Sequence, residues 1–392
     1  MDVERFIKGR VRDIDASGIR RVFDLAANLQ SPCNLSIGQP HFDVPEPIKA
    51  AAATAIHNGF NRYTQTQGTA DLRQKVILQL QEEFPSTIGT GEETHLREDL
   101  DVLITSGVSG ALVLALLTCV GPGDEVLVAD PYFVMYRHLV TLAGATPVFV
   151  DTYPDFQVTA QRIEPLLTDR SRMVLFNSPS NPTGVVAPPS CCKEVAELCQ
   201  RHNLLLLSDE IYDAYCYNAT NEPGADLMHC PSPASYSSDL LLLRGFSKTY
   251  AMTGWRLGYI VGPQPLIEQM TKLQQYSFVC APSMAQIAGE LALETDMSDI
   301  ISQYRRKRDY VVERLLPYYE LTYPGGALYA FPEVPPRLQQ TATEFVESAV
   351  AQNLLIIPGS VFSQRDTHFR LSYACDDAML EQGLDILVAM AQ

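Results

Sequence analysis

One lysine in this sequence stands where its amine could do covalent chemistry. Lys248 lies in the stretch GFSKTYAMTGWRLGY, among small and aromatic residues, and Arg256 follows near the end of the same stretch. A lysine on a loop beside Phe, Tyr, Met and Trp side chains is expected to be partly buried, with a solvated lysine as the alternative. Burial lowers the pKa of an amine and favours its neutral, nucleophilic form. The stretch therefore indicates a lysine that can attack a carbonyl group.

Polar segments follow short apolar runs elsewhere in the chain. The successive pairs of run and segment are DVLIT with SGVSGA, EVLVA with DPYF, RMVLF with NSPSNPTG, LLLLS with DEIYDAY, and LLLLR with GFSKTY. Ligands of open α/β sheets bind beyond the carboxyl ends of the strands, so these segments are expected to meet at one edge. Together they offer an amine for a Schiff base, a carboxylate for a pyridinium nitrogen, and donors for a phenolate and a phosphate. Pyridoxal phosphate requires this set.

Each segment taken alone also has a structural interpretation. SGVSGA could be a tight turn that opens a helix with Ser109 as its N-cap, NPTG is a good turn sequence, and DEIY could cap a helix. SGVSGA lacks the glycine spacing of a dinucleotide fingerprint or a P-loop, which disfavours a nicotinamide-dependent dehydrogenase. A dehydrogenase would also leave Lys248 and Arg370 without roles. The case for pyridoxal phosphate therefore depends on the conjunction of the segments.

The apolar runs themselves indicate the fold. Seven β-rich runs, of which LGYIVG is the last, alternate with helical patterns between about residues 100 and 262. Continuous apolar runs spaced by helices are typical of a parallel sheet that is buried on both faces. Few residues separate Arg244 from Leu257, so the last strand is expected to run antiparallel to its neighbour. The sequence predicts an α/β domain with a mostly parallel seven-stranded sheet flanked by helices.

The C-terminal third has a different pattern. Long helical stretches, a Gly-Gly turn in GGALYAF and a strand in HFRLSYA indicate a smaller α+β domain. The loop-rich segment that ends near Val44 is too short to fold alone and is expected to pack on this smaller domain. We therefore predict a large cofactor-binding domain at 45–275 and a small domain formed by 1–44 and 276–392. The helical stretches are expected at 264–295, 297–317 and 342–352.

Composition excludes several classes of protein. The 392 residues carry a formal net charge of −17, which repels phosphate backbones and anionic lipid surfaces, so neither nucleic acid nor a membrane is expected as a partner. Nine scattered cysteines without a C-x-x-C pair argue against disulfides and a metal site, and favour a cytoplasmic setting. The N-terminus carries charges of both signs where a signal peptide needs an apolar core.

Four motifs together resemble a known family. SPSNPTG, SDEIYDAY, GFSKTYAMTGWRLGY and FRLSYA occur in the order and at the spacing of the class I and II aminotransferases, which are pyridoxal-phosphate enzymes of fold type I. The resemblance covers nearly the whole chain. Each motif is weak by itself, whereas four in order are specific. The resemblance implies a fold type I enzyme with pyridoxal 5′-phosphate as its cofactor.

The resemblance implies a role for each residue that matches a family motif. Lys248 would form the Schiff base with the cofactor and later move a proton between the substrate's α-carbon and the cofactor. Asp209 would pair with the pyridinium nitrogen, and Asn181 and Tyr212 would bind the phenolic oxygen. Phe133 would stack on the ring, with the tyrosine before it as a competitor. Lys248, Asp209 and Tyr212 are thus the implied catalytic residues.

The same resemblance assigns residues to the phosphate and to the substrate. The implied phosphate cup consists of Val108, Ser109, Ser247 and Arg256. Arg370 would clamp the substrate's α-carboxylate, a bidentate task that suits arginine better than lysine. Gly38 and Asn181 would contact the substrate beside it. A surface salt bridge is the alternative for Arg370.

Tyr63 matches a tyrosine that reaches the phosphate of a neighbouring subunit, which implies a homodimer with shared active sites. An ordinary packed aromatic is the alternative for Tyr63. The implied reaction is a ping-pong transfer of the α-amino group of an L-amino acid to a 2-oxo acid by way of pyridoxamine phosphate. The same fold also hosts β-lyases, racemases, decarboxylases and cyclopropane-forming synthases. A cofactor-sensing transcription factor is disfavoured, because about 100 N-terminal residues are expected to form the enzyme's own arm and first helices, and the net charge is −17.

The substrate side chain is the least determined feature. Some family members carry a cation for a distal carboxylate after the glycine-rich turn, where this chain has the uncharged run VSG, so a dicarboxylate donor is disfavoured. Other arginines could still supply that charge, namely Arg20, Arg21 and Arg137. Apolar and aromatic residues expected near the site favour a neutral or aromatic donor, namely Ile37, Phe42, Tyr132, Met135 and Phe278.

Overall fold

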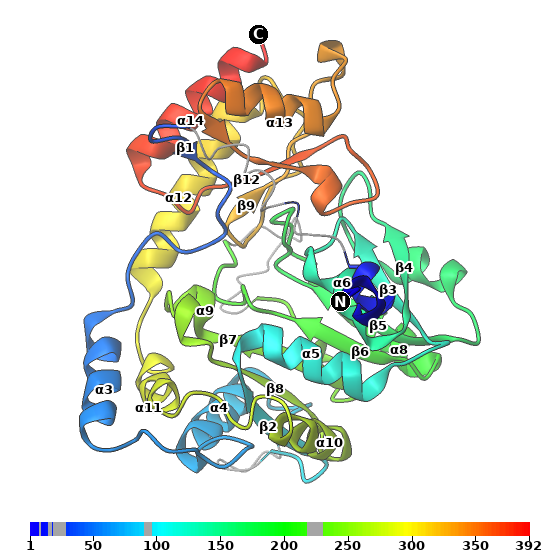
Figure 1. The fold of residues 1–392 in the computed structure, drawn as a ribbon, viewed down its shortest axis with the longest axis vertical. Helices are drawn as coiled ribbons and strands as arrows, with labels where there is room; N and C mark the ends of the chain where they lie inside the picture. The colour runs from blue at the N-terminus through cyan, green and yellow to red at the C-terminus, as the bar shows by residue number, and fades with distance from the viewer. Residues whose placement is uncertain (8, 15–17, 19–28, 90–95, 218–229) are drawn as a thin grey trace.

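The structure is a computed structural model that describes residues 1–7, 9–14, 18, 29–89, 96–217 and 230–392 (Figure 1). Two of the candidate cations for the substrate, Arg20 and Arg21, lie outside the described residues. None of the helices in the described ranges is both long and apolar enough to cross a membrane.

A seven-stranded sheet forms the centre of the molecule. The strands, in the order in which they lie side by side, are β2 (Leu100–Thr105), β8 (Gly258–Pro263), β7 (Leu240–Gly245), β6 (Leu205–Asp209), β5 (Ser171–Asn177), β3 (Glu125–Asp130) and β4 (Thr146–Asp151). All neighbours are parallel except that β8 runs antiparallel to both β2 and β7. The predicted strands and the antiparallel direction of the last one are confirmed. The connection from β7 to β8 holds only short helices, because it is too short for a full crossover.

Helices cover both faces of this sheet, which explains why its strands are apolar along their whole length. The helices are α3 (Glu46–His57), α4 (Ala70–Glu83), α5 (Gly107–Cys119), α6 (Met135–Ala143), α7 (Ala160–Ile163), α8 (Pro189–Arg201), α9 (Phe246–Thr249), α10 (Gln264–Gln275) and α11 (Ser283–Ala292). On β7, Leu240 and Leu242 share a core with α4, α8 and α11. Leu241 and Leu243 point the other way, into a core with α5, α6 and α10. Alternate side chains on one strand thus fill two cores.

The predicted single helical stretch at 264–295 is wrong in one respect, because it forms two helices. α10 ends at Gln275 and α11 begins at Ser283. Pro282 immediately precedes α11, and proline lacks the backbone N–H that a continuous helix would need. Val279 adopts a positive φ of 67°, which also breaks the helical path. The break leaves the aromatic segment between the helices on the surface.

A second core lies above the sheet in Figure 1. We call residues 298–392 together with 29–43 the C-terminal lobe, and residues 45–292 the sheet lobe. The elements of the C-terminal lobe are α12 (Ser298–Leu315), α13 (Ala342–Ala351), α14 (Asp377–Met390), β1 (Cys33–Asn34), β9 (Tyr329–Ala330), β10 (Leu354–Leu355), β11 (Ile357–Pro358) and β12 (Phe369–Ser372). β1 pairs with β10, and β11, β12 and β9 form an antiparallel sheet. These contacts join the N-terminal segment to residues from the far end of the chain.

The packing of helix α11 indicates where a boundary between two domains would lie. Its buried residues Ala285, Ala288 and Ala292 belong to the same core as α4 and β2. α11 also lies beside α3 in Figure 1. This packing favours a boundary after Ala292, whereas the sequence predicts one after residue 275. The division of the chain into two domains stays a prediction.

Candidate active site

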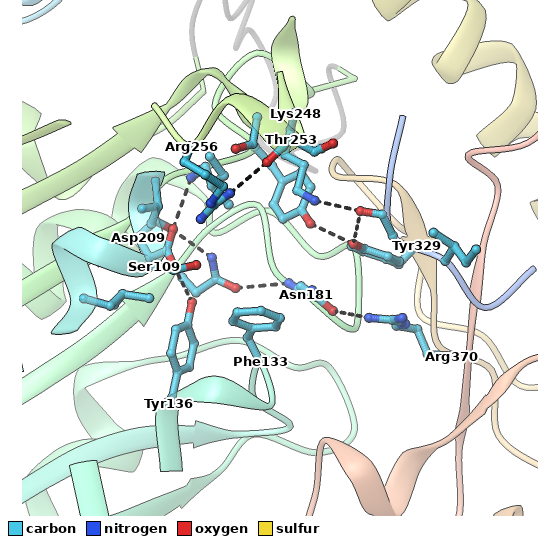
Figure 2. A pocket seen from close by; sticks show the side chains of 18 of the residues that line it. Ser109, Phe133, Tyr136, Asn181, Asp209, Lys248, Thr253, Arg256, Tyr329 and Arg370 are labelled. Carbon is cyan, nitrogen blue, oxygen red and sulfur yellow. Dashed lines mark hydrogen bonds between the residues drawn. The ribbon is translucent and has the colours of Figure 1, made fainter. Parts of the chain in front are cut away.

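A cavity of about 390 Å³ lies between the carboxyl edge of the sheet and the C-terminal lobe (Figure 2). Its walls come from the ends of β5 and β6, the start of α5, the β7–α9 connection, the N-terminal segment, β9 and β12. The lining residues singled out by the sequence are Gly38, Val108, Ser109, Phe133, Asn181, Asp209, Tyr212, Ser247, Lys248, Arg256 and Arg370. One cavity thus collects almost all of the predicted site residues, which are spread over more than 300 positions of the chain.

Lys248 lies in the one-turn helix α9 that directly follows β7. Its Nζ donates a hydrogen bond to the backbone oxygen of Gly38 at 2.7 Å. Burial lowers the pKa of this amine, and the positive charges of Arg370 and Arg256 lower it further, while Tyr329 opposes them. The solvated-lysine interpretation is therefore wrong, and a larger share of the amine is neutral than in water.

Asp209 is the last residue of β6 and is buried. Its carboxylate accepts hydrogen bonds from Tyr136 Oη at 2.8 Å and from the backbone N–H of Ile211 at 3.2 Å. Burial raises the pKa of Asp209 to about 6, although both hydrogen bonds and the nearby Lys248 act in the opposite direction. A cationic group placed against this carboxylate would replace its missing solvation.

The start of α5 and Arg256 form a concave, electropositive corner of the cavity. The helix begins at Gly107 with Ser106 as its N-cap, so the structural interpretation of Ser109 as the N-cap is wrong. Gly107 has φ +69°, and a Cβ there would lie 2.7 Å from Arg256 Nη2. Only glycine therefore allows the guanidinium to lie against the helix N-terminus. The free N–H groups of a helix N-terminus and an arginine together suit a phosphate.

Arg370 enters the cavity from β12 in the C-terminal lobe. It is 2% exposed, and no carboxylate lies within ion-pairing distance of it among the residues that the structure describes. Its Nη1 donates to Asn181 Oδ1 at 3.0 Å and its Nη2 donates to the Ser36 oxygen at 2.8 Å. Its Nε is buried and has no partner. The surface salt-bridge interpretation is wrong, and a buried guanidinium with unused donors indicates a site for an anion.

Two tyrosines meet beside Lys248. The hydroxyl groups of Tyr212 and Tyr329 lie 2.7 Å apart. Tyr212 follows β6, whereas Tyr329 belongs to β9 of the C-terminal lobe. Figure 2 shows Tyr329 between Lys248 and Arg370. The phenol pair therefore joins the two walls of the cavity.

Several residues expected at the site lie outside the cavity. Tyr132 is buried against Phe149 and does not line the cavity, so the competition with Phe133 is resolved in favour of Phe133. Arg137 interacts with the Tyr132 phenol and likewise does not line the cavity. Of the apolar candidates for the substrate pocket, Ile37 lines the cavity, whereas Phe42, Met135 and Phe278 do not. Tyr63 is 83% exposed and is therefore not a packed aromatic within this chain.

The lining residues that were not singled out from the sequence include Tyr136, Asn177 and Tyr329. Tyr136 lies three residues after Phe133, and the two rings are in edge contact with centroids 5.5 Å apart. Asn177 is the last residue of β5, and its Nδ2 donates to the Asp209 oxygen at 2.8 Å. Its strand-end position was a usable signal. Tyr329 had no such signal, because its strand is two residues long.

These side chains fit pyridoxal phosphate. The buried Nε of Arg370 lacks a partner, and the contact between Gly107 and Arg256 leaves the helix start open to an anion. The hydrogen bonds to the Asp209 carboxylate come from the neutral Tyr136 hydroxyl and the Ile211 N–H. An amine with a lowered pKa completes the set. In the described part of the chain, no three His, Cys, Asp or Glu side chains are grouped as they would be around a metal ion. The fold and the donor set define a pyridoxal-phosphate enzyme of the α/β type.

Comparison with known proteins gives the same class and a family. The family model described as "Aminotransferase class I and II" matches residues 31–387. The "Probable aspartate aminotransferase" of Methanocaldococcus jannaschii is 33% identical over 393 residues, covering 97% of this chain and 98% of that protein. The "Aromatic-amino-acid aminotransferase 2" of Thermococcus litoralis is 32% identical, covering 97% and 96%. A crystal structure of an aspartate aminotransferase from Thermotoga maritima superposes with a TM-score of 0.88 at 29% identity, covering 98% of this chain and 99% of that one.

The chain belongs to the class I and II aminotransferases. It is a pyridoxal-phosphate-dependent transaminase with the fold type I architecture that its sequence predicts.

Proposed function

We propose that this protein moves the α-amino group of an L-amino acid to a 2-oxo acid in two half-reactions at the cavity. The observation that carries the proposal is the pairing of Lys248 with Arg370 across one cavity. A buried amine with a lowered pKa faces a buried guanidinium whose Nε has no partner. An amine that can hold a cofactor and a clamp for a carboxylate are the two groups that an α-amino acid needs.

The sheet lobe supplies the groups that would hold the cofactor. When bound, pyridoxal phosphate supplies an electron sink for negative charge at the substrate's α-carbon. Asp209 would hold the pyridinium nitrogen protonated, because a buried carboxylate gains from a nearby cation. Phe133 would stack on the ring, and Asn181 and Tyr212 would donate to the phenolic oxygen. The phosphate would lie among Val108, Ser109, Ser247 and Arg256.

Lys248 would then act as the proton carrier. Its Nζ would accept the proton from the substrate's α-carbon and hold it for the later protonation step, while the bound cofactor would supply the electron sink. The backbone oxygen of Gly38 fixes the amine through the 2.7 Å hydrogen bond. Arg370 would orient the substrate, because a guanidinium clamp holds a carboxylate in one plane. The amine and the clamp come from different lobes, so substrate binding would bring the lobes together.

The charged lining residues also limit the substrate. In the parts of the chain that the structure describes, the charged residues on the cavity wall are Asp209, Lys248, Arg256 and Arg370. Each of these has a role toward the cofactor or the α-carboxylate, and Ile37, Leu112 and Ile211 add an apolar surface. We therefore propose a donor with a neutral or aromatic side chain. The relatives are named for aspartate and for aromatic amino acids, so a panel that contains both classes decides the point by kcat/KM.

The surface near the cavity supports a homodimer with shared sites. Large apolar side chains are exposed at the end of α3 and in the segment between α10 and α11, namely Ile56, Phe60, Tyr63, Tyr276, Phe278 and Val279. Phe278 reaches to within about 4 Å of the start of α5, as shown by its 3.9 Å distance from the Cβ position of Gly110. Exposed apolar side chains of this size beside a site are typical of a subunit interface. A partner subunit placed there would bring its own Tyr63 toward the phosphate corner.

A mixing experiment tests the shared site. Lys248→Ala and Tyr63→Ala subunits are each expected to be poorly active, but a mixed dimer has one site with both native residues. Random exchange of subunits should restore roughly a quarter of the wild-type sites. Restoration would be measured as specific activity after denaturation and refolding of the mixture. No gain over the separate variants would contradict the shared site.

The cysteines support a reducing compartment. All nine lie in the described ranges and none forms a disulfide there; six are buried and three are half-buried. We propose a cytoplasmic location, because cysteines that form no disulfides are typical of proteins in a reducing compartment.

The visible absorption spectrum tests the function itself. Wild-type protein with pyridoxal phosphate should show a visible band that single amino acids bleach and a 2-oxo acid restores. Lys248→Ala should lose the covalently bound cofactor, which is checked by mass spectrometry after borohydride reduction. Release of ammonia or a thiol without any 2-oxo acid would favour the alternative, a lyase or synthase of the same fold.

A further inference from the structure

Tyr329 contacts both the cofactor side and the substrate side of the cavity. It is 1% exposed and belongs to β9, which pairs with the strand that carries Arg370. Its hydroxyl lies 2.7 Å from Tyr212 Oη and 3.4 Å from the Gly38 oxygen. Its ring lies under the guanidinium of Arg370, with Cζ 4.5 Å from the ring centroid. Figure 2 shows Tyr329 between Lys248 and Arg370.

The hydroxyl distances indicate which way the protons point. A phenol has one proton to donate and can accept up to two. The 3.4 Å separation from the Gly38 oxygen is long for an O–H···O bond, whereas 2.7 Å to Tyr212 is ideal. Gly38 already accepts the proton of Lys248 Nζ. Tyr329 is therefore expected to donate its hydroxyl proton to Tyr212 Oη. The hydroxyl proton of Tyr212 is then free to point into the cavity.

A neighbouring glycine fits this close packing. An ideal Cβ at Gly38 would lie 2.0 Å from Tyr329 Oη and 2.8 Å from Tyr329 Cζ. The backbone of Gly38 can approach Lys248 in this position only because it carries no side chain. The position of Tyr329 thus restricts the segment that fixes the lysine.

We propose that Tyr329 is a positioning residue that donates its hydroxyl proton to Tyr212 and thereby sets Tyr212 as a hydrogen-bond donor toward the cofactor, while its ring holds Arg370 in place. The proposal rests on the proposed function, because it assigns Tyr212 to the phenolic oxygen of pyridoxal phosphate. A hydroxyl that accepts a hydrogen bond is a stronger donor in its own right, since such chains polarise one another. The hydroxyl of Tyr329 would therefore act on the cofactor through Tyr212, and its ring would act on the substrate through Arg370.

Titratable groups face Tyr329 from every element packed against it. They are Tyr212 after β6, Lys248 in α9, Tyr304 in α12, Arg370 in β12 and Tyr373 after β12. The two tyrosines of the C-terminal lobe lie behind Tyr329, away from the cavity wall. The groups that share the cavity with Tyr329 are Tyr212, Lys248 and Arg370. Removal of the Tyr329 hydroxyl should therefore change the hydrogen bonding of Tyr212 first, because Tyr212 is its shortest contact.

The test is the pH titration of the visible absorption band in the holoenzyme, without substrate. A donor to the phenolic oxygen favours its anionic form, so a weaker donor raises the pKa of the bound cofactor. Tyr329→Phe removes the hydroxyl and keeps the ring, and should raise this pKa by roughly half a unit to one unit. Tyr212→Phe should raise it further. The double variant should match Tyr212→Phe alone, because Tyr329 acts through Tyr212.

A second variant separates the effect of the Tyr329 hydroxyl from the effect of its ring. Tyr329→Leu removes the ring as well and should add an increase in KM for the amino acid of about tenfold, whereas Tyr329→Phe leaves KM nearly unchanged. Tyr319→Phe is the matched control, because its hydroxyl is buried in the C-terminal lobe and bonds only to the Leu387 oxygen at 2.6 Å. It should leave both the absorption pKa and KM at the wild-type values.

The outcomes distinguish this inference from the proposed function. If the wild-type protein neither shows the band nor transaminates, the proposed function fails and the inference fails with it. If the wild-type protein does both but Tyr329→Phe titrates like the wild type, the inference alone is overturned. Full additivity of the Tyr329→Phe and Tyr212→Phe shifts would also overturn it, because Tyr329 would then act on the cofactor by another route.

Discussion

The charged side chains on the two walls of the cavity, the sheet side and the side of the C-terminal lobe, differ in how far their hydrogen bonds are satisfied. On the sheet side, Asp209 is held by two hydrogen bonds from its own lobe, and Arg256 bonds to the Thr253 oxygen at 2.9 Å. On the side of the C-terminal lobe, Arg370 is equally buried but keeps an Nε without a partner. Its Nη1 reaches across to Asn181 of the sheet lobe, whereas its Nη2 donates to the Ser36 oxygen within its own lobe.

This difference indicates a division of labour. A charge that is satisfied within its own wall is ready before any substrate arrives, which suits a permanently held cofactor. A buried guanidinium with unused donors is costly until an anion binds, which suits a substrate that comes and goes. We therefore expect variants of the sheet side to change the cofactor and kcat, and variants of the C-terminal lobe to change KM.

The largest effect is expected from Asp209→Asn. The change keeps the shape but removes the charge that would stabilise the protonated pyridinium nitrogen, so kcat should fall by about 10³-fold, or about 4 kcal/mol. Steady-state transamination kinetics and the visible spectrum check this expectation. Asp130→Asn, a buried carboxylate at the end of β3 outside the cavity, is the control and should keep most of its kcat. Similar losses of kcat in Asp209→Asn and Asp130→Asn would contradict a specific role for the sheet side in holding the cofactor.

The stability of the cofactor-free protein should depend on the same carboxylate. The pKa of Asp209 is raised from 3.8 to about 6 in the folded protein, so the folded state binds the proton more tightly than the unfolded state. Stability is therefore lost as pH rises from about 4 to about 6, by about 3 kcal/mol. Asp209→Asn should remove that loss. Urea unfolding at several pH values measures it, and parallel pH profiles for the two proteins would contradict the expectation.

Arg370→Lys tests the wall formed by the C-terminal lobe, where Arg370 would bind the substrate's carboxylate. Lysine keeps the charge but loses the fork of the guanidinium, so KM for the amino acid should rise by about 30-fold, or about 2 kcal/mol. The absorption band of the bound cofactor should stay as in the wild type. Arg365→Lys is the matched control, because Arg365 lies in the same lobe, is half-exposed and pairs with Asp151. A changed cofactor band in Arg370→Lys would show that the two walls are not separable.

The smallest effect is expected at Gly38, which packs against Tyr329 and accepts the hydrogen bond of Lys248. Gly38→Ala would push a methyl group against Tyr329 Oη, which lies 2.0 Å from the ideal Cβ position. Overpacking of this kind costs about 1–3 kcal/mol, so kcat/KM should fall by about tenfold. Gly121→Ala has nothing within 4 Å of its Cβ and serves as the control. Unchanged kinetics in Gly38→Ala would mean that Tyr329 is free to move aside.

The sheet lobe was the more predictable region. Its seven strands, the antiparallel β8 and the cluster of Asn181, Asp209 and Lys248 all follow from apolar runs that end in polar residues. The reason is local: a strand end and the residue after it are neighbours in sequence and in space. The helix break before Pro282 was also readable but was missed, because the periodicity on both sides is helical.

The C-terminal lobe was less predictable, and its site residues show why. Arg370 was found through a motif, whereas Tyr329 was not found at all, because its contacts with Tyr212 and Gly38 span 117 and 291 positions of the chain. Such contacts depend on how segments that are far apart in the sequence pack together.

The sequence by itself therefore determined the order of strands and helices, the family, and the chemistry collected at the edge of the sheet. Hydrophobic periodicity and strand-end residues carry that information within short stretches. Only the tertiary structure decided that Tyr136 bonds to Asp209, that Arg370 keeps a free donor, and that Tyr329 joins the two walls. These features depend on the distances between side chains from separate elements, which packing sets and no local pattern encodes.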